Sequence, residues 1–264
     1  MDWAGYFINL DRSPGRRAAI EGMLGQLGIF ENYRRFPAVE GGPHPTLKPG
    51  QVGCYHSHLN VLSAAPRDGR FIHVLEDDAI LSRYFVSFLK HPGTNLDGYD
   101  LIFTDVSCYG NLPLVRDFKK EFDKASKQME AGAVSIRLLN LQHTHFLGST
   151  SYLVNPRSLD KVTQSLQRGH SAGKPIDLYV SDEVFAGSLR AAVAFPFLTS
   201  IKLDDSSTIF EKSHFNRAFD LLRASFFIDQ DISILQAHMR AILPHEETAH
   251  DRLMSDFFYV YLHL

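Results

Sequence analysis

Cysteine is scarce in this sequence, which has only Cys54 and Cys108 in 264 residues. Two cysteines are too few for a disulfide framework and lack the paired spacing of a zinc site, so a reducing compartment is expected. No apolar run approaches the roughly 18 residues that a membrane-spanning helix needs. Because the first residues also lack the pattern of a signal peptide, a soluble cytoplasmic chain is predicted.

Positive charge is not in excess either. The chain has 27 Lys and Arg against 30 Asp and Glu, a formal net charge of −3. Nucleic acid is therefore not expected as the principal partner. The glycine fingerprints of dinucleotide-binding folds and P-loops are missing, and no internal repeat occurs. What remains is an ordinary globular chain, with 44% hydrophobic residues to form a core.

Short apolar runs alternate with helical patterns along most of the chain. Strands are predicted at four apolar runs, 6–10, 71–75, 100–105 and 151–154. Helices are predicted at three places, 14–27, 54–65 and the stretch that begins after Asn155. This alternation predicts an α/β fold with a largely parallel sheet.

The segments between these elements differ in composition. The stretch 39–53 is rich in Gly and Pro and is predicted to be an ordered loop. The charged stretch 116–132 is an exposed helix or a mobile loop. Helical patterns dominate the C-terminal region, at 215–227 and 231–243. The aromatic tail 256–264 fits core packing best, although peripheral contact with a membrane stays open.

Three consecutive carboxylates, Glu76, Asp77 and Asp78, follow the apolar run 71–75. Ligands of open α/β sheets bind at the carboxyl ends of strands. In an extended chain Glu76 and Asp78 point to one side and Asp77 to the other. Adjacent negative charges repel, and magnesium or manganese, which share their ligand shell with substrate phosphates, would compensate them. The alternative is a solvated helix N-terminus, where the helix dipole favours acids.

Basic residues gather between the first predicted strand and helix, where Arg12, Arg16 and Arg17 follow Asn9. Backbone N–H groups and guanidinium groups at such a turn favour anions, so a diphosphate could bind there. A solvated basic helix start is the alternative.

The helix predicted from residue 54 carries Cys54, His56 and His58. His56 and His58 are too close in sequence to share a helix face, which argues against a two-histidine zinc site. Cys54 and His58 could form a nucleophile pair by residue type, but no third, orienting group is identifiable.

Several blocks in order resemble glycosyltransferase family 25, which includes bacterial lipopolysaccharide and lipooligosaccharide sugar transferases and the related procollagen galactosyltransferases. The blocks are YFINLDRSPGRR, QVGCYHSHLNVL, HVLEDDAIL, and GSTSYLVNPRSLDKV followed by KPIDLYVSDEV. The match runs from about Tyr6 to Ile209. It implies a GT-A type, Rossmann-like catalytic domain over 1–209, followed by a helical C-terminal appendage over 210–264.

The resemblance also implies a nucleotide-sugar donor, for which UDP-galactose or UDP-glucose is a family-level guess, and manganese or magnesium. The acceptor would be a glycan or glycolipid such as lipopolysaccharide core. The metal ligands would be Glu76, Asp77 and Asp78. The residues around the donor would be Asn9, Leu10, Arg12, Arg17, Gly53, Ser57 and His58. A later, looser match would bring Asp204, Asp205 and Ser207 to the donor phosphates.

Members of such a family are thought to invert the anomeric centre, which needs one base to take the acceptor proton. Asp177 is the first candidate, and Asp182 and Glu183 follow it. The alternative for Asp177 is a helix cap just after Pro175.

Two other functions stay open from the sequence. Metal-dependent phosphohydrolases and nucleotidyltransferases also use carboxylates at strand ends and arginines on phosphates. A non-catalytic carbohydrate-binding protein could retain the same fold without turnover. The sequence does not indicate an oligomeric state.

Overall fold

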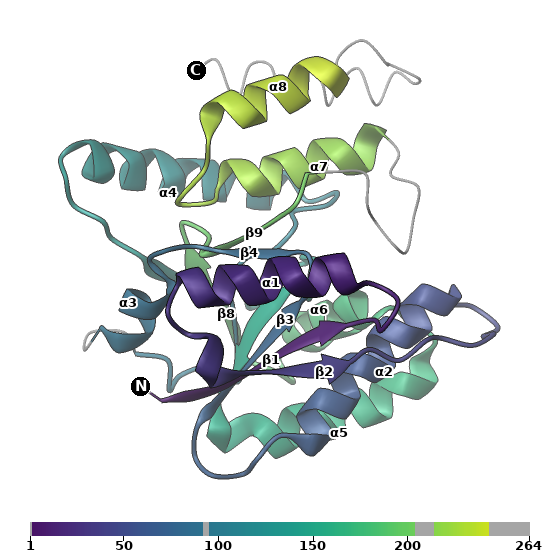
Figure 1. Ribbon diagram of the computed structural model, residues 1–264. Helices are drawn as coiled ribbons and strands as arrows, with labels where there is room; N and C mark the ends of the chain where they lie inside the picture. Colours follow the sequence, from purple (N-terminus) through teal and green to yellow (C-terminus); the bar gives the residue numbers. More distant parts are fainter. Residues whose placement is uncertain (1, 92–94, 204–213, 243–264) are drawn as a thin grey trace.

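A seven-stranded sheet organises the computed structural model, which describes residues 2–91, 95–203 and 214–242 (Figure 1). The strands lie in the order β2-β1-β3-β7-β5-β8-β6. Their bounds are β1 Trp3–Asn9, β2 Tyr33–Pro37, β3 Phe71–Glu76, β5 Leu101–Phe103, β6 Arg137–Asn140, β7 Ser151–Val154 and β8 Ala191–Phe195. A second, two-stranded sheet joins β4 (Ala79–Leu81) to β9 (Thr199–Ile201) in antiparallel pairing.

Most of the large sheet runs in one direction. β1 pairs in parallel with β2 and β3, and β5 pairs in parallel with β8. The antiparallel strands are β7, which lies between β3 and β5, and β6 at one edge. The predicted α/β class with a largely parallel sheet is therefore confirmed. The carboxyl ends of β1 and β3 lie at the same edge of the sheet, which gathers the residues that follow them.

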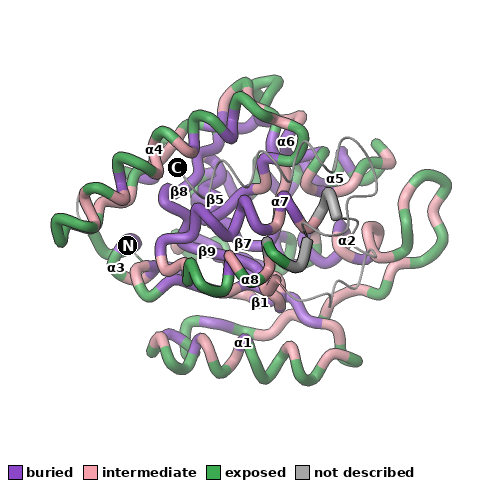
Figure 2. The backbone as a smooth tube through the Cα atoms, turned by 90° about the horizontal axis from the view of Figure 1, so that it is seen from above, coloured by how far each residue is buried: buried purple, intermediate pink, exposed green. Residues whose placement is uncertain are grey.

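Helices cover both faces of the sheet. Their bounds are α1 Pro14–Gln26, α2 Pro49–Ala64, α3 Phe85–Lys90, α4 Leu112–Glu130, α5 Leu159–Gly169, α6 Ile176–Phe185, α7 His214–Ser225 and α8 Ile232–Ile242. Short 3-10 turns are η1 Phe30–Asn32, η2 Pro156–Ser158 and η3 His170–Ala172. Buried side chains of α1 and α3 form one core cluster, and those of α2, α4, α5, α6 and α7 form the other. Figure 2 shows the buried sheet between helices whose outer faces are exposed.

The strand sequences explain this two-sided core. Successive side chains of a strand point to opposite faces, so a strand covered on both sides must be apolar throughout. In β3, Ile72 and Val74 pack with the cluster around α2 and α5, whereas Phe71 and Leu75 pack with α1 and α3.

The starts of two elements were predicted wrongly: β1 begins at Trp3 and not at residue 6, and α2 also begins earlier than predicted. The Gly/Pro-rich stretch 39–53 is a loop only as far as Lys48, because α2 begins at Pro49 and not at residue 54. Proline suits the first helical position, since its fixed φ matches the helix and its missing N–H has no partner to lose there. The side chain of Gln51 accepts a hydrogen bond of 3.0 Å from the Lys48 N–H and completes the start.

The charged stretch 116–132 lies almost entirely in α4, which resolves its two predicted alternatives in favour of a helix. The C-terminal helical patterns are also confirmed, as α7 and α8. Within the described ranges, no helix combines the length and the apolar character needed to cross a bilayer. The tail 256–264 and the positions 204, 205 and 207 lie outside the described residues.

Helix α7 belongs to the main core although it lies in the predicted appendage. The Phe226 ring packs against Phe118 of α4 and Phe195 of β8, with centroid distances of 5.7 and 5.6 Å. The Phe197 N–H donates a hydrogen bond of 2.8 Å to the Phe226 carbonyl. The appendage is thus joined to the sheet through shared apolar contacts and the backbone.

Candidate functional site

The three carboxylates after β3 face different neighbours. Glu76 ends the strand, and its Oε1 lies 3.3 Å from His58 Nε2 of α2 and accepts a 2.7 Å hydrogen bond from Ser149 Oγ, which precedes β7. Asp77 turns toward α1: Asn9 Nδ2 donates to its Oδ2 at 2.7 Å, and Arg16 Nη1 donates to its Oδ1 at 2.8 Å. This opposite orientation follows from the alternation of side chains along the chain.

Asp78 differs from its two neighbours in the surroundings of one carboxylate oxygen. Its Oδ1 is buried and makes no hydrogen bond to any residue that the structure describes. Burial, followed by the charge of Glu76, raises the pKa of Asp78 to about 6, although Arg16 opposes that rise. For Glu76 burial also raises the pKa, but the hydrogen bond and charge of His58 bring it below its ordinary value.

A cavity of about 340 Å³ opens at this carboxylate cluster. Glu76, Asp77 and Asp78 form one wall. The other residues around it come from the β1–α1 turn, the loop after β2 and the first turns of α2; they include Leu10, Arg12, Arg16, Gly53, Cys54, Ser57 and His58. Most of the residues predicted to surround a donor are therefore brought together.

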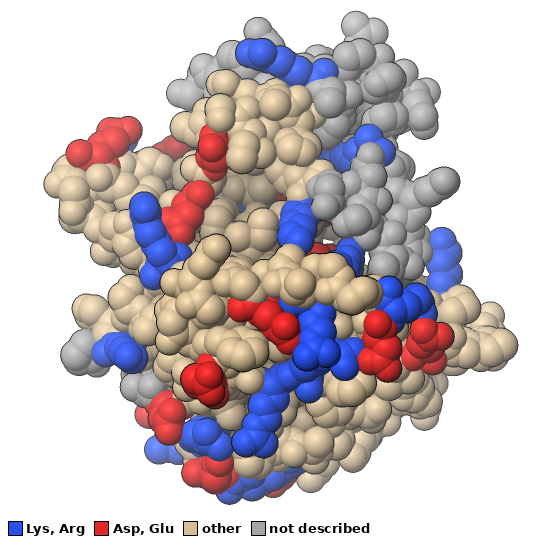
Figure 3. Space-filling view, viewed as in Figure 1, with Lys and Arg blue, Asp and Glu red and all other residues tan. Residues whose placement is uncertain are grey.

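The β1–α1 turn supplies the positive charge of this cavity. Arg16 holds Asp77, and Arg12 forms an ion pair with Glu40 of the loop after β2. Arg17 instead pairs with Glu21 at 2.8 Å along α1 and is absent from the cavity lining. Asn9 is buried beneath the cavity, where it orients Asp77. Figure 3 shows acidic and basic side chains intermingled on the face of the molecule that is seen in Figure 1.

Helix α2 approaches the loop after β2 closely, which explains two of its residues. A Cβ added to Gly53 would lie 2.4 Å from the Val39 carbonyl oxygen, so only glycine fits. Ser57 Oγ donates to the Gly53 carbonyl at 2.6 Å and accepts from the Val39 N–H at 2.8 Å. These contacts fix the loop that forms one wall of the cavity.

The three candidate bases on α6 are not brought together. Asp177 lies in the first turn, where its Oδ1 accepts a 2.8 Å bond from the Leu178 N–H. Burial, with a smaller contribution from the charge of Glu76, raises the pKa of Asp177. Asp182 pairs with Lys174 on the surface at 2.6 Å, and Glu183 accepts a 3.1 Å bond from Ser165.

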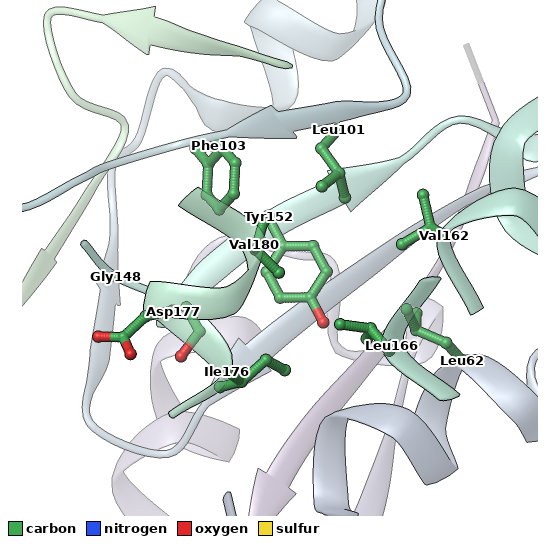
Figure 4. Close-up of a pocket in the computed structure, with 11 residues that line it drawn as sticks. Leu62, Leu101, Phe103, Gly148, Tyr152, Val162, Leu166, Ile176, Asp177 and Val180 are labelled. Carbon is green, nitrogen blue, oxygen red and sulfur yellow. The ribbon is translucent and has the colours of Figure 1, made fainter. Parts of the chain in front are cut away.

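Asp177 also borders a small apolar cavity of about 20 Å³. Figure 4 shows the Tyr152 ring among Leu62, Val162 and Leu166, with the Asp177 carboxyl group at the edge near Gly148. Because this cavity is the size of a single water and apolar, it does not suit a sugar. The chemistry is expected at the carboxylate-lined cavity.

Two site residues were missed by the sequence reasoning. Asp105 follows β5 as Glu76 ends β3, and it forms a buried ion pair with Arg223 of α7. Burial raises the pKa of Asp105 to about 6, although Arg223 opposes the rise. The charge of Arg223 also acts on Glu76 and Asp78. An acid at the end of the apolar run 101–103 was a usable signal, whereas the partner from α7 had none.

Comparisons with known proteins identify the family of the chain. The model of a family described as "Glycosyltransferase family 25 (LPS biosynthesis protein)" matches residues 4–180, which include the β1–α1 turn, α2, the carboxylate cluster and Asp177. A protein of Drosophila melanogaster named "Glycosyltransferase 25 family member" is similar, with 25% identity over 153 residues. The match covers 48% of this chain and 24% of that relative, so the chain corresponds to about a quarter of the relative's length.

Proposed function

The chain belongs to glycosyltransferase family 25, and from that premise we propose that it transfers a hexose from a UDP-sugar to a glycan acceptor with the help of a divalent cation. The observation that carries the proposal is the cavity that three carboxylates and the arginines of the β1–α1 turn line together. A nucleotide diphosphate needs both, a cation held by carboxylates and guanidinium groups on its phosphates. The mostly parallel sheet with carboxylates at strand ends supports a GT-A type assignment.

The residues present fit a manganese or magnesium ion. Asp78 has a buried oxygen without a hydrogen-bond partner in the described chain, and burial, followed by the charge of Glu76, raises its pKa. Glu76 lies on the same wall. Both oxygens of Asp77 already bind Asn9 and Arg16, so we propose Asp78 and Glu76 as ligands and Asp77 as the residue that holds the basic turn against them. When bound, the cation would stabilise the charge of the departing diphosphate.

The remaining steps belong to the protein's own side chains. Arg12 and Arg16, which line the same cavity, would hold the donor phosphates. Asp177 would accept the proton of an acceptor hydroxyl while that oxygen bonds to the anomeric carbon and the bond from this carbon to the diphosphate breaks. A raised pKa brings Asp177 closer to the range in which a carboxylate serves as general base. Attack opposite the leaving group would invert the anomeric centre.

UDP-galactose and UDP-glucose are the first donors to test, and a lipopolysaccharide core oligosaccharide is the first acceptor, as the family description suggests. Binding of a donor to the folded state raises apparent stability by mass action. We expect one UDP-sugar to raise the melting temperature in manganese but not in EDTA, and to yield a glycosylated acceptor with release of UDP. Undiminished transfer in EDTA would refute the dependence on a divalent cation. Release of free sugar without a glycosylated acceptor would indicate a hydrolase.

A further inference from the structure

A thiol, an imidazole and a carboxylate meet at the wall of the cavity. Cys54, His58 and Glu76 each offer one ligand atom, and these atoms lie within 4.8 Å of one another. Cys54 and His58 are on adjacent turns of α2, and Glu76 ends β3. We propose that the three side chains form a second cation site, selective for soft or borderline ions such as Zn²⁺ and Co²⁺.

The spacing suits such an ion. His58 Nε2 and Glu76 Oε1 are 3.3 Å apart. Two ligands at about 2.0–2.1 Å from a tetrahedral zinc ion lie about 3.3–3.4 Å apart, so this pair already has the required separation. A zinc-bound sulfur lies about 3.6 Å from the other ligand atoms, so the Cys54 sulfur, which is within 4.8 Å of them, needs to approach by up to about 1.2 Å. On binding, the thiol proton passes to solvent and the thiolate bonds to the metal.

Neighbouring groups orient two of the three ligands. His58 Nδ1 lies 3.0 Å from Tyr152 Oη, which leaves Nε2 directed at Glu76. Ser149 Oγ donates to Glu76 Oε1 at 2.7 Å. A histidine that binds a metal commonly engages its other ring nitrogen in such a bond, and ligating carboxylates are likewise hydrogen-bonded. Tyr152 and Ser149 come from β7 and the segment before it, which brace the site from the sheet.

Ligand type separates this site from the one proposed for manganese. Sulfur and imidazole favour zinc-like ions, whereas the carboxylate oxygens of Asp78 and Glu76 favour manganese and magnesium. Three protein ligands beside an open cavity leave a coordination position for solvent, which is typical of exchangeable zinc. Glu76 would be shared between the two sites. If the proposed function holds, a soft cation therefore competes with manganese and inhibits transfer.

Cobalt absorption tests the site without nucleotide or sugar. A Co²⁺–thiolate bond gives a charge-transfer band in the near ultraviolet, and only Cys54 and Cys108 can supply a thiolate. We expect the wild-type protein to develop this band with one equivalent of Co²⁺. Zn²⁺ should bleach the band, and Mg²⁺ should leave it unchanged. Cys108 is buried and absent from the cavity lining, so Cys108→Ser is the matched control that should keep the band.

The substitutions that should remove the site are Cys54→Ser, which abolishes the band, and His58→Gln, which lowers cobalt affinity at least ~10-fold. Circular dichroism melts verify that both variants fold. A wild-type protein without the band, or a band that persists in Cys54→Ser, overturns the proposal. Asp78→Asn should keep the cobalt band, because Asp78 is not a ligand of this site. Failure of the manganese-dependent transfer is therefore distinguishable from failure of the soft-cation site.

Discussion

Replacing Asp78 by asparagine is expected to abolish metal-dependent transfer. In the metal-free protein, the free energy of unfolding of this variant should rise relative to that of the wild type as the pH increases from 4 to 8. Oδ1 of Asp78 is buried and has no hydrogen-bond partner among the residues described. Burial and the charge of Glu76 raise the pKa of Asp78 from 3.8 to about 6. A residue whose ionisation destabilises the folded chain is typical of a functional site, where stability is given up for activity.

The magnitude follows from the pKa shift. A rise from 3.8 to about 6 corresponds to roughly 3 kcal/mol, because each unit is worth about 1.4 kcal/mol. Since the pKa is higher in the folded state, the folded protein binds more protons than the unfolded chain between these two values. The stability that Asp78 contributes is fully present below its unfolded pKa and is lost as the pH rises through 6. Asparagine does not titrate, so the variant does not lose this stability as the pH rises.

Urea unfolding in EDTA at pH 4, 6 and 8 measures the effect. Between pH 4 and pH 8 the free energy of unfolding of Asp78→Asn should increase, relative to that of the wild type, by up to about 3 kcal/mol. Manganese at pH 8 should then stabilise only the wild type. The control is Asp77→Asn, which weakens the bonds to Asn9 and Arg16 and should destabilise the protein at pH 8. A difference between Asp78→Asn and wild type that stays constant with pH would refute the reasoning.

Three other outcomes are expected. Asp177→Asn should lower kcat at least ~100-fold with the donor Kd unchanged, whereas Asp182→Asn on the same helix should stay within about twofold; equal losses in both would remove Asp177 as the base. Arg223→Met should lower the free energy of unfolding by about 3–5 kcal/mol, because it leaves Asp105 buried and unpaired. Adding Asp105→Asn should restore much of the lost stability, and urea unfolding of the single and double variants measures both effects. Arg12→Ala should raise the Kd for UDP measured by calorimetry, and an unchanged Kd would place this exposed arginine outside the donor site.

Local sequence patterns predicted several elements of the fold. The runs 71–75 and 151–154 became β3 and β7, and α1 begins at Pro14 as predicted, because proline suits the first helical position. The sequence reasoning missed β2, β4, β6, β8 and β9, although β8 lies inside the large sheet. The five residues of β8, AAVAF, are an apolar run too short to distinguish a strand from a buried helical turn. Its place depends on pairing with β5 and β6, which lie far away in the sequence.

For the candidate site, the sequence predicted which residues belong together but not their contacts. Glu76, Asp77 and Asp78 were predicted as a group because they are consecutive and follow an apolar run. The contacts of each carboxylate could not be predicted, because the contacting side chains come from other elements. These side chains are Asn9, Arg16, His58 and Ser149. Asp182 and Glu183 were chosen for their residue type close to Asp177, but helical geometry turns them toward Lys174 and Ser165.

The predicted boundary at residue 209 separates sequence patterns but not the charges of the site. The family match ends at residue 180, and Arg223 lies beyond it on α7. Yet Arg223 pairs with the buried Asp105, and its charge also acts on Glu76 and Asp78. Without that cation, Asp105, Glu76 and Asp78 would share a buried region with fewer positive charges, which favours protonation over metal binding. A chain ended at residue 209 would therefore lose a counter-ion of the carboxylate cluster while keeping every residue that the family match covers.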